Sequence, residues 1–214
     1  MNLVLLGPPA AGKGTQAKKL NAELGLPQIS TGDILRAAIR EGTEMGRKAK
    51  PLMDSGNLVP DDVVVGIIEE RVRRPDCHAG FLLDGFPRTI PQAEALEGLL
   101  AKRGKRIDKV ISLEVPAELI IERMSGRRSC PKDGSVYHLV QNPPKKAGQC
   151  DLCHGPLVQR DDDAPEKVKR RQIEYAEMTA PLKDFYAKRK LLASVNGTGA
   201  PDAIFAEVKK ALGR

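Results

Sequence analysis

Short apolar runs alternate along the chain with longer stretches in which apolar residues recur at helical spacing. The apolar runs predict five strands, at Leu3–Leu6, Pro27–Ser30, Phe81–Leu83, Val110–Leu113 and Leu191–Val195. The longer stretches predict helices at Lys13–Leu24, Asp33–Arg40, Asp61–Arg73, Pro91–Lys102, Pro116–Met124, Glu166–Lys190 and Asp202–Leu212. Because strands and helices alternate, we expect an α/β fold with helices on both faces of a parallel sheet.

Two stretches interrupt this alternation. Residues 30–59 are mostly helical in pattern and carry no strong strand signal, which predicts a helical insert. Residues 127–163 gather Gly, Pro and Cys and lose helical periodicity. That length is too great for a bare loop in a compact domain, so we expect a small module with its own means of cohesion. The remaining ranges, 1–29, 60–126 and 164–214, are expected to form the core.

Composition narrows the function classes. The 214 residues carry 35 Lys and Arg against 28 Asp and Glu, a formal charge of +7, which favours a polyanionic partner. Aromatic residues are only 3% of the chain and the basic residues are dispersed, which argues against a surface that stacks unpaired bases. No apolar run approaches the roughly 18 residues of a membrane span, and the segment Met1–Leu6 lacks the basic flank of a signal peptide. We therefore expect a cytoplasmic protein.

A glycine-rich segment, Gly7–Thr15, stands directly between the first predicted strand and the first predicted helix. In this context backbone N–H groups and a helix N-terminus are offered to phosphate oxygens, and Lys13 reaches the outer phosphates. The match to G-x4-G-K-[ST] is inexact, because Gly14 occupies the hydroxyl position and Thr15 follows it. A tight turn without a ligand is the alternative, but strand, spacing, lysine and helix together favour a nucleoside triphosphate site.

Further blocks extend this pattern over nearly the whole chain in a fixed order. They are the loop through Gln16, then Thr31–Arg36, Asp84–Thr89, Arg123–Arg128, and Gln159–Asp163 followed by Arg171. Together they resemble the adenylate kinases, a family of nucleoside monophosphate kinases whose phosphate loop is G-K-G-T. One departure is Ala10, where that family commonly has Gly. Alanine replaces glycine without strain there only if the backbone avoids positive φ.

The resemblance implies a P-loop fold with a five-stranded parallel sheet and the reaction ATP + AMP = 2 ADP with Mg²⁺. Such a transfer needs alignment and cations rather than a general base, because the acceptor phosphate oxygen is already ionised. Six side chains are expected to be catalytic: Lys13, Arg88, Arg123, Arg127, Arg160 and Arg171. Taken singly, each arginine would more simply belong to a surface salt bridge, and only its place in a matching block favours the site.

The same resemblance distributes the remaining site residues. ATP is expected at Ala10, Ala11, Gly12, Lys13, Gly14, Thr15, Arg127, Val136, Tyr137 and Gly199. AMP is expected at Thr31, Arg36, Asn57, Leu58, Val59, Gly85, Phe86, Pro87, Arg88, Gln92, Arg160 and Arg171. Asp84 is expected to hold Mg²⁺ through water. Two functions are possible for Asp162 and Asp163. They could cap the following helix, or they could orient the arginines as the segment 127–163, the lid of the family, closes.

Three cysteines fall in the irregular module, with Cys150 and Cys153 in a C-x2-C arrangement. In a cytoplasmic chain this spacing indicates metal binding or redox chemistry before a disulfide. The resemblance is to the zinc-containing lids of bacterial adenylate kinases, which commonly have four cysteines. It implies a structural Zn²⁺ on Cys130, Asp133, Cys150 and Cys153, with His138 as the alternative fourth ligand. A metal-free lid held by hydrogen bonds remains open, and Cys77 is expected to be ordinary packing.

Three other functions remain as alternatives. A kinase of another nucleoside monophosphate would share every block. A zinc-ribbon nucleic-acid-binding protein would explain the cysteines and the charge but not Gly7–Thr15 or Asp84–Thr89. A switch GTPase would need an N-K-x-D element, which the sequence lacks. We expect the partners to be ATP, AMP and ADP, without nucleic acid or membrane, and the resemblance suggests a monomer.

Overall fold

The computed structural model describes all 214 residues and is built on a five-stranded parallel sheet. The strand order is β2-β3-β1-β4-β7, and β1 pairs in parallel with both β3 and β4 at the centre. The strands of this sheet are β1 (Asn2–Leu6), β2 (Gln28–Ser30), β3 (Phe81–Asp84), β4 (Lys109–Glu114) and β7 (Leu192–Asn196). The predicted α/β class is confirmed, and each predicted strand lies within a residue or two of the observed one.

Nine α-helices and three shorter helical turns complete the chain. The α-helices are α1 (Lys13–Leu24), α2 (Thr31–Glu41), α3 (Glu44–Ser55), α4 (Asp61–Val72), α5 (Ile90–Ala101), α6 (Ala117–Gly126), α7 (Pro165–Glu174), α8 (Leu182–Lys188) and α9 (Pro201–Ala211). The short turns are η1 (Pro75–Cys77), η2 (Asp161–Asp163) and η3 (Tyr175–Thr179). None of these helices is long and apolar enough to cross a membrane.

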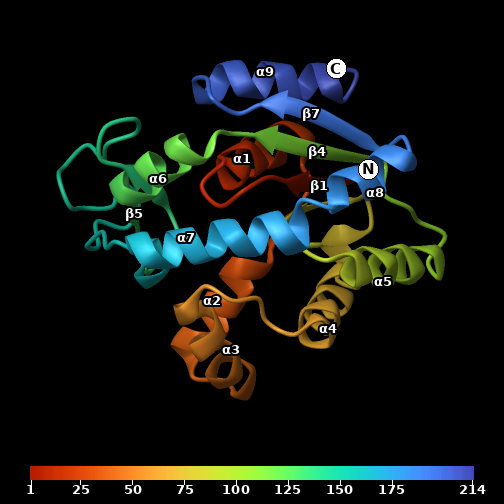
Figure 1. Cartoon of the computed structure of the whole chain (residues 1–214), viewed down its shortest axis with the longest axis horizontal. Helices are drawn as coiled ribbons and strands as arrows, with labels where there is room; N and C mark the ends of the chain where they lie inside the picture. Colours follow the sequence, from red (N-terminus) through yellow and green to blue (C-terminus); the bar gives the residue numbers. More distant parts are fainter.

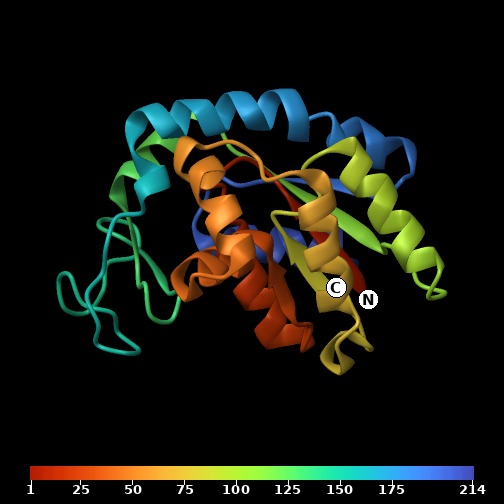
Figure 2. The same ribbon diagram turned by 90° about the horizontal axis from the view of Figure 1, so that it is seen from below.

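The core has two halves, one on each face of the sheet. Successive residues of β1 point to opposite faces, so Val4 and Leu6 join one cluster while Leu3 and Leu5 join the other. The first cluster includes buried residues of α4, α5 and α8, and the second includes buried residues of α1, α6 and α9. Figures 1 and 2 show these helices around the sheet, with α9 beside β7.

The segment predicted as a helical insert forms two packed helices, α2 and α3. The Ser30 hydroxyl accepts a hydrogen bond from the Asp33 N–H at 3.2 Å, and the Thr43 hydroxyl accepts one from the Gly46 N–H at 3.1 Å, so each helix has a side-chain N-cap. Gly46 permits the close approach of the two helices, because a Cβ there would lie 2.1 Å from the Ala38 carbonyl oxygen. The pair projects from the body of the molecule below α7 in Figure 1.

The single helix expected over Glu166–Lys190 is wrong. The chain instead forms α7, the π-helical turn η3 and then α8. Pro181 has no N–H to donate to a preceding carbonyl, so it cannot continue an α-helical ladder. Just before it, the Ala180 N–H donates to the Tyr175 carbonyl oxygen at 2.8 Å. This bond spans five residues instead of the four of an α-helix, so the turn contains one extra residue.

The irregular module contains a small antiparallel hairpin of β5 (Arg127–Ser129) and β6 (Val136–His138), separate from the main sheet. In Figures 1 and 2 this segment extends to the left of the molecule, away from the main sheet. Its only buried apolar cluster consists of Cys130, Tyr137 and Cys150. So few apolar residues give little cohesion on their own.

Candidate active site

The segment Gly7–Gly12 forms a loop at the carboxyl end of β1, and α1 begins immediately after it at Lys13. Gly7 has a φ of 141°, and a Cβ on it would lie 2.8 Å from the Leu113 carbonyl oxygen, so the loop passes tightly over β4. Gly12 precedes α1 with a φ of 95°. The loop therefore aims backbone N–H groups and the positive end of α1 at one region, which favours a bound anion.

Ala10 does not meet the condition for an unstrained alanine. Its φ is 58°, in the left-handed region that alanine rarely adopts. The loop imposes this conformation because its ends are fixed by β1 and α1, and alanine is strained there. The chain keeps the phosphate-loop path that a glycine would follow more easily.

The Lys13 side chain lies over the loop it follows. Its Nζ donates hydrogen bonds of 2.8 Å to both the Gly7 and the Pro8 carbonyl oxygens. Burial lowers the pKa of Lys13 from 10.5 to about 8; Asp84 opposes this shift, while Arg88 and other arginines add to it. Lys13 is thus a cation held at the mouth of an anion-binding loop, with much of its solvation already lost.

A cleft opens beside the loop and is lined by residues from the loop, the insert, the segment after β3, and α7. Thr31 Oγ1 and Arg88 Nε both donate hydrogen bonds of 2.9 Å to the Gly85 carbonyl oxygen, which ties the insert to the segment after β3. The predicted residues that line this cleft are Lys13, Thr31, Arg36, Asn57, Leu58, Val59, Gly85, Pro87, Arg88, Gln92 and Arg171. Phe86 does not line it, because its ring is 1% exposed and lies in the core.

Several arginines approach one another around the cleft. Burial lowers the pKa of Arg88 to about 10, with Arg171 and Arg36 adding repulsion. Burial likewise lowers the pKa of Arg160 to about 10, with Arg36 and Arg127 adding to it. Guanidinium groups that repel one another in this way favour the binding of a polyanion, which would offset their repulsion.

Acidic side chains orient these arginines. Asp163 forms an ion pair with Arg127 through two hydrogen bonds, the Nε contact being 2.8 Å. Asp162 accepts a hydrogen bond of 2.7 Å from Arg171 Nη1, and Arg171 with the other arginines lowers the Asp162 pKa despite its burial. Neither acid caps α7, whose N-cap is Ala164 and has no side-chain hydrogen bond. Of the two functions left open for Asp162 and Asp163, the geometry supports orientation of the arginines.

The segment after β7 lies against the other side of the loop. Arg123 Nη2 donates a 2.8 Å hydrogen bond to the Gly197 carbonyl oxygen, and its Nη1 reaches the Ala10 carbonyl oxygen at 3.5 Å. Gly199 follows two residues later, in the same connection to α9. These contacts place Arg123 and the start of the connection to α9 beside the Gly7–Gly12 loop.

Asp84 ends β3 next to the phosphate loop. Its Oδ2 accepts a hydrogen bond of 3.1 Å from Gln28 Nε2 and lies 3.5 Å from where a Cβ on Gly14 would be. Burial raises the pKa of Asp84, while Lys13 opposes the shift. A carboxylate beside phosphate-binding N–H groups suits a hydrated Mg²⁺.

Two hydrogen-bonding residues at the site were not predicted. Gln28 binds Asp84, and Asp61 accepts hydrogen bonds from Thr89 and Gln92 at the start of α5. The sequence showed Asp61 only as an acid at a helix N-terminus, where carboxylates are common for electrostatic reasons alone. Its contacts reach 28 and 31 residues along the chain, so no local pattern could reveal them.

A sequence model of the family described as adenylate kinase matches residues 5–191. The chain belongs to the adenylate kinase family. A relative described as adenylate kinase from Anaeromyxobacter dehalogenans is 55% identical over 100% of both chains. Relatives with the same description from Carboxydothermus hydrogenoformans and Trichlorobacter lovleyi are 54% identical over 99% of both chains and 57% identical over 94% of both. The chain is accordingly an enzyme of the nucleoside monophosphate kinase class.

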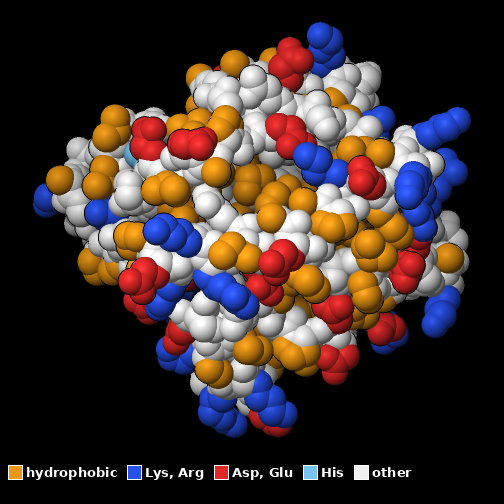
Figure 3. Space-filling view, viewed as in Figure 1, with side chains coloured by type: hydrophobic (Ala, Val, Ile, Leu, Met, Phe, Trp, Pro, Cys, Tyr) orange, Lys and Arg blue, Asp and Glu red, His pale blue; other side chains and the backbone are white.

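Membership of the adenylate kinase family disfavours the zinc-ribbon and GTPase alternatives. The charge distribution agrees with this. On the face in Figure 3, Lys and Arg are scattered across the surface, with Asp and Glu among them. Three arginines, Arg36, Arg88 and Arg171, line the cleft instead.

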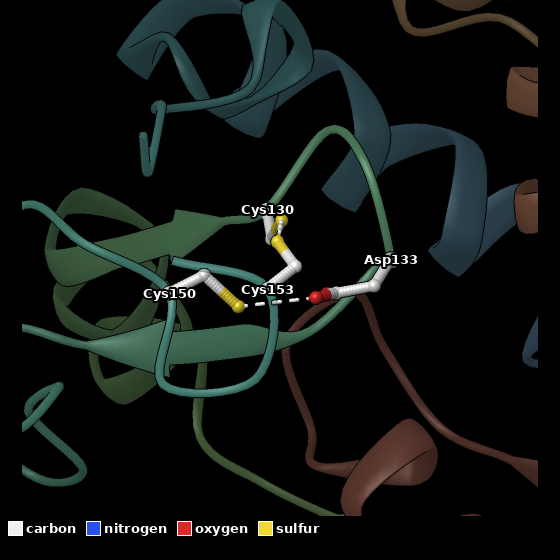
Figure 4. Close-up of side chains that lie close together, drawn as sticks. All are labelled: Cys130, Asp133, Cys150 and Cys153. Atoms are coloured by element: carbon white, nitrogen blue, oxygen red, sulfur yellow. Dashed lines mark hydrogen bonds between the residues drawn. The ribbon is translucent and has the colours of Figure 1, made fainter. Parts of the chain in front are cut away.

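The irregular module of this adenylate kinase family member brings four potential metal ligands together. One ligand atom from each of Cys130, Asp133, Cys150 and Cys153 lies within 4.8 Å of all the others. Cys130 Sγ and Cys153 Sγ are 3.3 Å apart, and Cys150 Sγ is 3.1 Å from Asp133 Oδ2. Figure 4 shows the four side chains converging on one point.

His138 is not part of this cluster, so it is excluded as the alternative fourth ligand. Its Nδ1 accepts hydrogen bonds from the Val140 and Gln141 N–H groups at 3.2 and 3.0 Å, and its Nε2 is buried against Gly126. Tyr137 packs against the cysteines. The residue is 8% exposed, and its hydroxyl lies 3.5 Å from Cys150 Sγ.

Proposed function

We propose that the cleft catalyses the reversible reaction ATP + AMP = 2 ADP. The observation that carries the proposal is that Lys13, Arg36, Arg88 and Arg171 line one cleft with the segment Gly7–Gly12 at its edge. Arg127 and Arg160 lie close enough to this group to repel its arginines. Two polyanions repel each other as they approach, and this set of cations offsets that repulsion. The family's printed name and the full-length relatives support the same reaction.

ATP is proposed to bind at the loop. The N–H groups of Ala10–Thr15 and the start of α1 hold its β- and γ-phosphates, and Lys13 shifts from its own loop carbonyls onto the phosphates. Arg123 and Arg127 approach from the other side, and the backbone at Val136, Tyr137 and Gly199 lies along the adenine. Phosphate oxygens are stronger partners for Lys13 than the neutral carbonyls that it contacts now.

AMP is proposed to bind between the insert and α5. Arg36 and Arg88 hold its phosphate in bidentate fashion, a task for which planar guanidinium groups are suited. Thr31, Gly85, Pro87 and Gln92 lie beside its base, and the segment Asn57–Val59 forms the wall opposite. Phe86 contributes only backbone, because its ring is buried.

The transfer itself needs no general base in this arrangement. Arg88, Arg123, Arg127, Arg160 and Arg171 with Lys13 stabilise the charge that spreads over the equatorial oxygens of the phosphoryl group. Asp162 and Asp163 keep Arg171 and Arg127 aimed at it. Mg²⁺, held through water by Asp84, would neutralise part of the ATP charge.

Two units are proposed to move against the core formed by residues 1–29, 60–126 and 164–214. The insert, residues 30–59, closes over AMP, and the lid, residues 127–163, closes over ATP. Closure would bring Arg127 and Arg160 of the lid onto the phosphates and exclude water, which otherwise competes as the acceptor. The enzyme is proposed to act as a monomer in the cytoplasm, and its four cysteines, which form no disulfide, agree with a reducing compartment.

Zinc is proposed as the metal of the lid, held by Cys130, Asp133, Cys150 and Cys153. The donor set suits it, because thiolates favour Zn²⁺ over Mg²⁺ or Ca²⁺. The spacing also suits it, because ligand atoms within 4.8 Å of one another can be spanned by bonds of about 2.3 Å to one ion. The ion would supply cohesion that the apolar cluster of only three buried residues in this module cannot.

Metal analysis of the purified protein tests this assignment. We expect about one zinc per chain, and a lower melting temperature after removal of the metal by a chelator. Cys150→Ser should lose the zinc, whereas Cys77→Ser, a buried cysteine outside the cluster, should retain it. A metal-free protein whose melting is unchanged by chelator would contradict the zinc lid.

The activity is tested by ADP formation from ATP with AMP, GMP, CMP or UMP at equal concentrations. We expect AMP to be the preferred acceptor. Lys13→Ala should lower kcat by a factor of about 100 or more, because it removes a cation that acts on the transferring group. Lys19→Ala on the same helix, whose Nζ pairs with Asp202 at the surface, is the matched control. Equal rates for wild type and Lys13→Ala would overturn the mechanism.

A further inference from the structure

Asp61, the first residue of α4, joins that helix to the beginning of α5. Its Oδ2 accepts a hydrogen bond of 2.8 Å from Thr89 Oγ1, and its Oδ1 accepts one of 2.7 Å from Gln92 Nε2. The two partners are almost completely buried, with Thr89 3% and Gln92 1% exposed. Both carboxylate oxygens of Asp61 are therefore engaged in fixing side chains beside the cleft.

The carboxamide of Gln92 is held in one orientation by two neighbours. Its Oε1 accepts a hydrogen bond of 2.8 Å from the Arg88 N–H, and its Nε2 donates to Asp61. A carboxamide can turn by 180° with almost no change in shape. Here the turned form would set Nε2 against the Arg88 N–H and Oε1 against the Asp61 carboxylate, and both contacts would be repulsive.

Gln92 also lines the cleft where the acceptor base is placed. After the bonds to Arg88 and Asp61, its carboxamide retains one N–H and one oxygen lone pair. Adenine offers an N6 amino donor next to the N1 acceptor. Hypoxanthine offers the reverse, an O6 acceptor next to an N1–H donor. A carboxamide of fixed orientation can therefore match only one of these two edges.

We propose that Asp61 determines base specificity by locking the Gln92 carboxamide in the orientation that accepts a 6-aminopurine and rejects a 6-oxopurine. Asp61 is a positioning residue here, because it acts through Gln92 and not on the nucleotide itself. The proposal rests on the proposed function, in which AMP lies beside Gln92. The wrong base is rejected because it would leave the buried polar groups of Gln92 without hydrogen-bond partners.

The test compares AMP with IMP, which differs from AMP only at positions 6 and 1 of the base. Asp61→Asn keeps the size of the side chain but no longer obliges Gln92 to donate, because the Asn amide can present either its oxygen or its N–H. Only the Arg88 N–H then opposes the turned carboxamide, so the turned form becomes accessible. We expect the ratio of kcat/KM for AMP to that for IMP to fall about tenfold, the value of one hydrogen bond to the base. Asp62→Asn removes the same charge from the same helical turn without a hydrogen bond to α5, and should leave the ratio unchanged.

A second pair of variants separates this effect from a general loss of structure. In a Gln92→Ala background, Asp61→Asn should leave the AMP-to-IMP ratio unchanged, because the carboxamide that it orients is gone. The ratio does not depend on the fraction of folded enzyme, and Asp61→Ser is the alternative should Asp61→Asn not fold. An equal loss with AMP and IMP, or a further change of the ratio in the Gln92→Ala background, would overturn the proposal. A wild-type enzyme that does not use AMP would instead overturn the proposed function.

Discussion

Lys13 carries its charge at an energetic cost in the free protein, which makes ATP binding depend on pH. Its pKa falls from 10.5 to about 8 because of burial and the neighbouring arginines, and a bound polyphosphate would raise the pKa again. Above about pH 8 Lys13 is largely neutral in the free enzyme and charged in the complex, so binding takes up a proton. The affinity for ATP should therefore weaken as pH rises above about 8.

Calorimetry of ATP binding near pH 8.5, repeated in buffers with different ionisation enthalpies, measures this proton directly. Wild type should take up a substantial fraction of one proton, and Lys19→Ala should do the same. Lys13→Ala should take up much less. Equal uptake by Lys13→Ala would show that another group is responsible.

Ala10 stores strain that a single substitution should release. Its φ of 58° costs alanine about 1–2 kcal/mol but costs glycine almost nothing. Part of the gain is offset by the greater freedom of glycine in the unfolded chain. Ala10→Gly should therefore raise the free energy of unfolding by about 0.5–1 kcal/mol, as measured by urea denaturation.

Ala11→Gly is the matched control for Ala10, because Ala11 is buried, belongs to the core and has no positive φ. It should lose about 1 kcal/mol or more, since only packing and backbone entropy change there. Equal losses of stability in Ala10→Gly and Ala11→Gly would contradict backbone strain at Ala10.

Single residues show where sequence reasoning succeeds and where it stops. The sequence grouped Lys13, Arg88 and Arg171 in one site because each belongs to a motif block, and all three line the same cleft. The sequence could not show that Asp162 holds Arg171 or that Asp61 orients Gln92, because these contacts depend on side-chain direction and distant packing. It also left the backbone at Ala10 undecided, because the loop and not the residue determines φ there.

At the scale of elements, the contact of α2 with α3 decides the shape of the insert. Gly46→Ala would place a Cβ 2.1 Å from the Ala38 carbonyl oxygen, so the helices must separate. We expect a loss of about 1–3 kcal/mol in the free energy of unfolding. We also expect Gly46→Ala to raise the KM for AMP more than the KM for ATP, because the insert carries Thr31, Arg36 and Asn57.

Gly66→Ala gives the matched comparison for Gly46. Gly66 is also helical, in α4, but a Cβ there meets nothing within 4 Å. The substitution should stabilise the protein by up to about 1 kcal/mol through helix propensity alone. Similar losses in both variants would mean that the close contact of α2 and α3 is unimportant.

Element prediction succeeded where the hydrophobic period is strong. All five strands and the helices on both sheet faces follow from it, because buried strands are continuous apolar runs and covering helices are amphipathic. It failed over Glu166–Lys190, where the apolar spacing continues through a backbone that widens at η3 and turns at Pro181. The spacing of apolar residues in the sequence does not reveal where the backbone hydrogen bonds change from a four-residue to a five-residue span.

At the scale of the whole molecule, the sequence also predicted an irregular module with metal-ligand spacing, and the structure brings Cys130, Asp133, Cys150 and Cys153 together. His138 could be excluded only from the fold, since its distance from the cysteines depends on how the β5–β6 hairpin turns. The limits and the motion of the lid and the insert remain predictions.

The central claim is that one cleft transfers the γ-phosphoryl group of ATP to the phosphate of AMP. The most direct measurement follows ATP labelled at the γ-phosphorus, incubated with AMP, Mg²⁺ and the enzyme. The label should appear in the β-phosphate of ADP, with two ADP formed for each AMP consumed, and Arg88→Ala should reduce this transfer strongly. Label released as inorganic phosphate, or ADP formed at the same rate without AMP, would contradict the account.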